Sequence, residues 1–232
     1  MSDTKRYWDI RASTWSTISE PLRLSDAELL HYEMMVSQYS KSTSRNCLIL
    51  GATEKLFDLF GQSCNITCID ISNKMIELID RTKHSSITTI NGDWLQRYDQ
   101  HIPDGTLTHV VGDGIFSLLT WSSEYIQLLN NAYVMLRKNG LFIVRLFVPG
   151  ANPFNPYANA DEHGFRTMMH MAIIENEYNV PIHFEDCIVT YSFPPLNSFL
   201  ELASRQFKIE NILFPTDTGY NDHYVTVCLR KK

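Results

Sequence analysis

The chain has 232 residues, which is long enough for one large domain with a sizeable buried core. Its formal net charge of -6 is dispersed along the sequence, which argues against nucleic acid as a partner because phosphate binding needs a basic surface. No apolar run approaches the roughly 20 residues that span a bilayer, and the N-terminus lacks a hydrophobic signal core, so we expect a cytoplasmic protein with no membrane partner. The five cysteines lack zinc-like spacing, so we expect reduced thiols and no metal site.

The first 44 residues are rich in aromatic side chains and helix formers. Ser25 and Asp26 precede an apolar-periodic stretch, as a helix cap does, and they predict one amphipathic helix over residues 26–40. We expect residues 1–44 to form a helical lid.

Residues 45–149 alternate short apolar runs with helical segments. This alternation implies right-handed βαβ crossovers and a parallel sheet. After the last helix, basic residues and Gly140 are typical of a helix C-terminus. We expect strands at 47–50, 65–71, 86–90, 107–111 and 141–147, and helices at 55–60, 74–81 and 123–136.

Beyond residue 149, the expected order is a loop at 149–161, a helix at 162–178, a loop or short strand near 181–192 and a helix at 196–205. Strands at 207–213 and 224–230 follow each other without a helix, so they predict an antiparallel hairpin. We therefore expect one doubly wound α/β domain with a mostly parallel, seven-stranded sheet. Residues 45–149 would be its cofactor-binding core, 150–193 a substrate-lid insertion after the fifth strand, and 194–232 the last helix and hairpin.

Ligands of open α/β sheets bind outside the carboxyl ends of the strands. Gly51 ends the first strand, where it permits either close approach of a ligand or a tight turn. Asp70 ends the second strand 19 positions later and is suited to accept from two ribose hydroxyls, although it could simply cap the next helix. Met75 in that helix is either an adenine contact or a core residue.

Two further strand ends carry acidic residues. Asp93 could accept from the exocyclic amine of adenine, with Trp94 beside the ring, or it could be a turn residue. The stretch Gly112-Asp113-Gly114 predicts an exposed, bent loop. There Asp113 would meet a substrate amine or hydroxyl, or the ammonium of a cofactor; a plain turn is the alternative.

Five segments together resemble the successive motifs of the class I S-adenosylmethionine-dependent methyltransferases of small-molecule type: NCLILGATEKL, ITCIDISNKMIELI, INGDWLQ, VVGDGIFSLL and LLNNAYVMLRKNGLFIVRLF. The resemblance covers residues 45–149, and the terminal hairpin is similar to the seventh strand of that family. It implies that the first-strand loop lies under the methionine part of S-adenosylmethionine, that Asp70 holds the ribose and that Asp93 meets the adenine. The N-terminal aromatic residues are similar to the lid of such enzymes. The implied cofactor site comprises Tyr7, Trp15, Gly51, Ala52, Thr53, Asp70, Ile71, Met75, Gly92, Asp93, Trp94, Gly112, Asp113 and Gly114.

The sequence departs from the family at the glycine-rich loop, because Ala52, Thr53, Glu54 and Lys55 follow Gly51. A dinucleotide-binding oxidoreductase would need its glycine triplet for the pyrophosphate, whereas S-adenosylmethionine has no phosphate. The departure also keeps open a non-catalytic or regulatory protein that binds the cofactor without turnover.

The sulfonium of the cofactor already activates the methyl group, so the enzyme mainly aligns the reactants. A base is needed only if the acceptor is protonated. His163 is the first candidate for this catalytic role, Asp113 the second and His109 a weaker one; a packing or surface role remains open for each histidine. We expect methyl transfer to a small-molecule acceptor.

Overall fold

The computed structural model describes residues 3–13, 15–17, 23–40, 45–61, 63–147, 195–214 and 224–232. The expected insertion at 150–193, with its helix at 162–178, lies outside these residues. The helices are α1 (Asp3–Ser13), a short 3-10 turn (Trp15–Thr17), α2 (Asp26–Tyr39), α3 (Glu54–Gly61), α4 (Asn73–Glu77), a second 3-10 turn (Ile115–Leu118), α5 (Ser123–Met135) and α7 (Leu196–Ser204). The strands are β1 (Asn46–Leu50), β2 (Asn65–Asp70), β3 (Thr88–Asn91), β4 (Leu107–Asp113), β5 (Leu136–Phe147), β6 (Phe207–Leu213) and β7 (Tyr224–Lys231).

The strands form one seven-stranded sheet in the order β3-β2-β1-β4-β5-β7-β6. Neighbouring strands from β3 to β5 are parallel, and β7 is antiparallel to both β5 and β6. This confirms the doubly wound, mostly parallel sheet with an antiparallel terminal hairpin. The reversed strand lies inside the sheet, with β6 at the edge. The strand order changes direction beside β1, which pairs with both β2 and β4.

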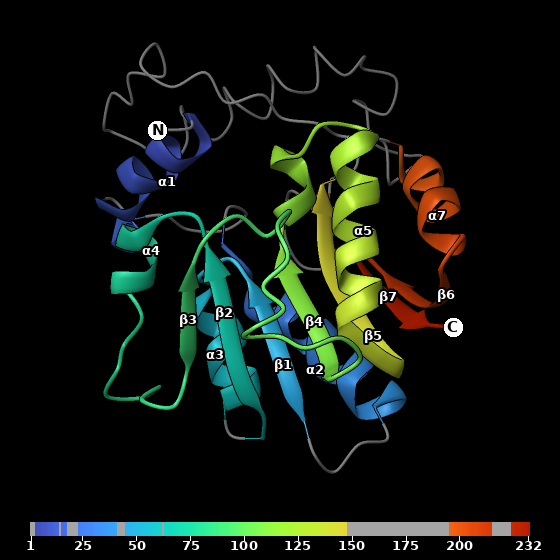
Figure 1. The fold of residues 1–232 in the computed structure, drawn as a ribbon, viewed down its shortest axis with the longest axis horizontal. Coiled ribbons are helices and arrows are strands. Elements are labelled where there is room, and N and C mark those ends of the chain that lie inside the picture. Colours follow the sequence, from blue (N-terminus) through green and yellow to red (C-terminus); the bar gives the residue numbers. More distant parts are fainter. Residues whose placement is uncertain are drawn as a thin grey trace.

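Helices cover both faces of the sheet, with α5 on one side and α3 on the other (Figure 1). The side chains of β1 point alternately to the two faces, as the pleat of a strand requires. Leu48 packs in the cluster that contains Phe199 of α7, and Ile49 packs in the opposite cluster with Phe57 of α3. Burial on both faces explains why β1 reads as a continuous apolar run.

The helix α2 begins at the cap that the sequence predicts. The Ser25 hydroxyl accepts from the Glu28 amide at 3.1 Å, and the Glu28 carboxylate accepts from the Ser25 amide at 2.9 Å, which is a capping box. Tyr32 of this helix is fully buried and packs in the cluster that contains α3. Thus α2 belongs to the layered core, whereas α1 lies at the carboxyl end of the sheet, beside α4 (Figure 1).

Two predicted helix ends were wrong. The helix expected at 74–81 ends at Glu77, because Asp80 accepts from the amide and hydroxyl of Thr82 and starts a turn. At the end of α5, the chain passes directly into β5 at Leu136 without a glycine cap. The left-handed residue there is Asn139, with φ 63°.

No helix in the described ranges has the length and apolar character to cross a membrane.

The left-handed backbone at Asn139 predicts how substitutions act there. Asn139→Ala should lower the free energy of unfolding by about 1 kcal/mol, because the left-handed conformation is unfavourable for alanine, whereas the short polar side chain of asparagine offsets the strain by local hydrogen bonding. Asn139→Gly should leave stability unchanged or raise it. Urea denaturation of both variants measures this. Equal losses of unfolding free energy in both variants would show that contacts of the Asn139 side chain, and not the left-handed φ, determine stability at this position.

Candidate functional site

The carboxyl ends of the parallel strands lie side by side along one edge of the sheet. Leu50 at the end of β1 pairs with Ile69 of β2 and with Gly112 of β4. Beyond these pairs, Asp70 is in register with Asn91 of β3. The four strand ends that the sequence singles out are thus neighbours.

The loop after β1 is a tight turn around Gly51. Its φ of 88° is in the left-handed region, which only glycine adopts readily. The Thr53 amide donates to the Gly51 carbonyl at 2.9 Å, and α3 begins at the next residue. A Cβ added at Gly51 would lie 3.7 Å from Cζ3 of Trp94, so the Trp94 ring lies against this loop. The first and third strand ends therefore meet.

The carboxylate of Asp70 joins the loops after β1 and β2. Its Oδ2 accepts from the Ala52 amide at 2.8 Å and its Oδ1 accepts from the Ser72 amide at 2.8 Å. The residue is 5% exposed, and burial raises the pKa of its carboxyl to about 6 although the two amide bonds oppose the shift. A carboxylate has about four acceptor positions, so two remain for the hydroxyls of a ligand.

The segment after Asp70 also holds α1 in place. Ser72 is fully buried; its hydroxyl accepts from the Met75 amide at 3.2 Å and donates to Asp9 of α1 at 2.6 Å. Asn91 donates to the carbonyls of Asp70 and Ile71, both at 3.1 Å. The sequence did not predict roles for Asp9, Ser72 and Asn91. Their hydrogen bonds join segments that are distant in the sequence, and such contacts cannot be read from a local pattern.

The predicted N-terminal aromatic residues pack together near α4. The Tyr7 and Trp8 rings lie 5.3 Å apart, and the Trp8 and Trp15 rings 6.4 Å apart. Arg11 donates from Nε to the Tyr7 hydroxyl at 3.0 Å. Met75 is 2% exposed and belongs to the apolar cluster against which Trp8 and Trp15 pack. In this structure Met75 packs in the core, and its contact with adenine stays a prediction.

Asp93 has the turn role that the sequence left open. Its Oδ1 accepts from the Leu95 amide at 2.9 Å, and its carbonyl accepts from the Tyr98 hydroxyl at 3.0 Å. A Cβ added at Gly92 would lie 1.9 Å from that hydroxyl, so the absence of a side chain at Gly92 lets the Tyr98 hydroxyl lie close to the backbone. Asn131 of α5 donates to the carbonyl of Leu95 at 2.8 Å and fixes the turn.

The expectation of an exposed loop at 112–114 was wrong. Gly112 and Asp113 are the last residues of β4, and only Gly114 has the left-handed φ of 62°. The Asp113 side chain is 8% exposed, and its Oδ1 accepts from Nε of Arg145 at 2.5 Å. The Tyr32 hydroxyl donates to the Gly112 carbonyl at 2.7 Å and attaches α2 to this strand end.

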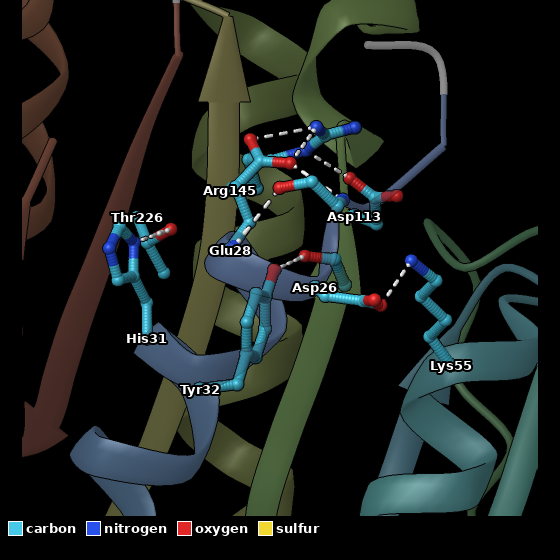
Figure 2. Close-up of polar contacts among 10 residues, drawn as sticks. Asp26, Glu28, His31, Tyr32, Lys55, Asp113, Arg145 and Thr226 are labelled. Carbon is cyan, nitrogen blue, oxygen red and sulfur yellow. Dashed lines mark hydrogen bonds and ion pairs between the residues drawn. The ribbon is translucent and has the colours of Figure 1, made fainter. Parts of the chain in front are cut away.

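Arg145 lies between two carboxylates (Figure 2). Its Nη1 donates to Oε1 and Oε2 of Glu28 at 2.9 and 2.8 Å, while its Nε donates to Oδ1 of Asp113. Burial raises the pKa of Asp113, with the guanidinium opposing that shift. Burial disfavours the charged form of Arg145, but Asp113 and Glu28 outweigh it and raise the pKa of the guanidinium. The sequence signal for this group was a single arginine inside the apolar run of β5.

The structure describes one of the two histidines that the sequence suggests as a general base. His163 lies outside the described residues. His109 is fully buried in β4, where its Nδ1 is 2.8 Å from the Thr108 hydroxyl, and burial lowers its pKa to about 4. It pairs with Cys47 near the start of β1, away from the strand ends, so it is a packing residue. Within the described ranges, no three His, Cys, Asp or Glu side chains gather to form a metal site.

No family model and no curated protein sequence matches the chain. Solved structures do match. The N-methyltransferase NodS from Bradyrhizobium japonicum, in complex with S-adenosyl-L-homocysteine, has a TM-score of 0.65 at 13% identity over 99% of both chains. A geranyl diphosphate C-methyltransferase from Streptomyces coelicolor, in complex with Mg²⁺, geranyl-S-thiolodiphosphate and S-adenosyl-L-homocysteine, has a TM-score of 0.64 at 10% identity over 99% of this chain and 97% of that chain. A putative S-adenosylmethionine-dependent methyltransferase from Listeria monocytogenes has a TM-score of 0.59 at 12% identity over 90% of this chain and 100% of that chain. The chain therefore has the class I S-adenosylmethionine-dependent methyltransferase fold.

Asp70 makes the stability of the protein depend on pH. Its folded pKa of about 6 exceeds the unfolded value of about 3.9, so the native state binds the proton more tightly than the unfolded chain does. The contribution of Asp70 should therefore fall by about 2 kcal/mol as pH rises from 4 to 6. Urea denaturation should show Asp70→Asn gaining stability relative to wild type over this range. A difference that stays constant with pH would contradict the raised pKa.

Proposed function

We propose that the protein binds S-adenosylmethionine at the carboxyl edge of its sheet and transfers the methyl group to a small-molecule acceptor. The observation that carries the proposal is the buried carboxylate of Asp70. It is fixed by two backbone amides and keeps acceptor positions for two ribose hydroxyls. The fold supports the same cofactor, since similar structures contain S-adenosyl-L-homocysteine.

The loop after β1 favours S-adenosylmethionine over a dinucleotide. A pyrophosphate is held by free backbone amides of a glycine-rich turn at a helix N-terminus. Here the Ala52 amide already donates to Asp70, and Gly51 is the single glycine of the loop. The space beside Gly51 is bounded by the Trp94 ring, which suits a flat nucleoside or an uncharged chain better than a phosphate.

The chain's own residues would position the cofactor and exclude water. Asp70 would hold the ribose, the backbone of 51–53 would lie under the methionine part, and the second oxygen of Asp93 with Trp94 would face the adenine. The Asp9–Ser72 hydrogen bond would keep α1 over the ribose end of the site. When bound, the cofactor supplies an activated methyl group, so alignment and desolvation account for most of the catalysis. A general base is needed only if the acceptor is protonated, and His163 and Asp113 remain the predicted candidates for that role.

Calorimetry tests this function. Wild-type protein should bind S-adenosylmethionine and S-adenosyl-L-homocysteine, and Asp70→Ala should weaken both by about 1–3 kcal/mol, the range for a lost charged hydrogen bond. Because Asp70 also joins two loops, Asp70→Asn provides a milder variant, with circular dichroism to check folding. The matched control is Glu77→Gln, which changes an exposed carboxylate on α4.

Three results are decisive. Absence of binding by the folded wild-type chain would reject the function. Unchanged dissociation constants in folded Asp70→Asn and Asp70→Ala would reject the role of Asp70. Tight binding without methyl transfer to any of a panel of amines, phenols, thiols and carbon acids would favour the non-catalytic alternative, which the single-glycine loop keeps open.

A further inference from the structure

A buried charged cluster lies at the end of β4 and consists of Glu28 of α2, Asp113 of β4 and Arg145 of β5 (Figure 2). Their side chains are 5%, 8% and 1% exposed. The Arg145 guanidinium also lies 4.6 Å from the centre of the Tyr224 ring, so little water reaches it. The three side chains carry one positive and two negative charges, which leaves one negative charge unbalanced among them.

The unbalanced charge is concentrated on Asp113. Both oxygens of Glu28 accept from Arg145, and Oε2 also accepts from the Ser25 amide. Asp113 accepts one hydrogen bond, through Oδ1. Its Oδ2 makes no hydrogen bond within the described part of the chain, and Figure 2 shows this oxygen pointing away from the guanidinium. A carboxylate oxygen with no partner among the described residues is an acceptor that a positive group of a ligand can meet.

The position of Asp113 places this charge at the proposed cofactor site. Asp113 follows Gly112, which pairs with Leu50, the residue before the Gly51 loop. The strand end of β4 is thus adjacent to the loop that would lie under the methionine part of the cofactor. That part carries two positive groups, the ammonium and the sulfonium, and an acidic oxygen at this point complements either of them.

We propose that Arg145 and Glu28 are positioning residues for cofactor binding. Arg145 fixes Asp113 through Oδ1, Glu28 fixes Arg145 and takes up its charge, and Oδ2 of Asp113 is thereby left negative for a cationic group of the ligand. This inference rests on the proposed function.

Glu28→Gln separates charge from shape. Glutamine keeps one oxygen, which at the Oε2 position serves both the Ser25 amide and Arg145, while an NH2 group replaces Oε1 and the negative charge is removed, so that Arg145 neutralises Asp113. The dissociation constant of S-adenosylmethionine should rise roughly fivefold in Glu28→Gln and roughly tenfold in Asp113→Asn, as for a lost charge interaction in a partly shielded site. The neutral 5′-methylthioadenosine, which keeps the adenosine and the thioether but lacks the amino-acid chain, should bind all variants equally. Thermal unfolding of each ligand-free variant checks its fold.

The matched control is Asp26→Asn, which removes the same charge from the same helix. The Asp26 side chain is 92% exposed and bonds to Lys55 at 2.7 Å on the surface (Figure 2), where water screens it. The affinity of the Asp26→Asn variant for S-adenosylmethionine should equal that of wild type.

S-adenosyl-L-homocysteine identifies which positive group is held, because it keeps the ammonium and lacks the sulfonium. Selective weakening of both amino-acid-bearing ligands supports the proposal with the ammonium as partner, and selective weakening of S-adenosylmethionine supports it with the sulfonium. Equal weakening of all three ligands, or no weakening of any, would overturn the proposal while the proposed function stands. Failure of the wild type to bind any of the three would reject the proposed function, and this inference with it.

Discussion

The carboxylate of Asp70 is the interaction on which the strand-end arrangement depends. It accepts the Ala52 amide from one loop and the Ser72 amide from the next, so it fixes the ends of β1 and β2 relative to each other. Ser72 then holds α1 through Asp9. Burying a carboxylate is unfavourable, and the two short amide bonds offset part of that cost. A group held in this way is oriented before any ligand arrives, which lowers the entropic cost of binding.

The same edge of the sheet carries a consistent charge pattern. Asp70 and Asp113 are both acidic and largely buried, and they lie on the two strands that flank β1. Arg145 is the positive group that reaches Asp113, and Glu28 shares it. An edge of this kind disfavours phosphate groups and favours hydroxyl donors and cations. A nucleoside joined to a cationic chain meets both requirements, which explains why the fold, the loop chemistry and the electrostatics agree.

The sequence predicted most strands, because their apolar runs end at glycine or polar residues such as Gly51 and Asp70. It also predicted the start of α2 from the Ser25 cap. It did not predict the short α4, where the side chain of Asp80 competes with the helix, or the direct passage from α5 into β5. These outcomes depend on local hydrogen bonds that a periodic pattern does not encode.

The sequence predicted only part of the candidate site, because the rest depends on contacts between residues that are distant in the sequence. Asp70 and Gly51 follow from their places at strand ends. The partner of Asp113 lies 32 residues away and Glu28 lies 117 residues from Arg145, so their meeting depends on packing. One signal was available, because an arginine within the apolar run of β5 must be paired if that strand is buried. His163 and the insertion at 150–193 stay predictions.

A crystal structure of the protein with bound S-adenosyl-L-homocysteine would show directly whether Asp70 holds the ribose. Both ribose hydroxyls should lie within hydrogen-bonding distance of the Asp70 carboxylate, with the Ala52 and Ser72 amides still in place. An ordered adenosine bound elsewhere, with Asp70 shielded from it by protein side chains, would rule this role out.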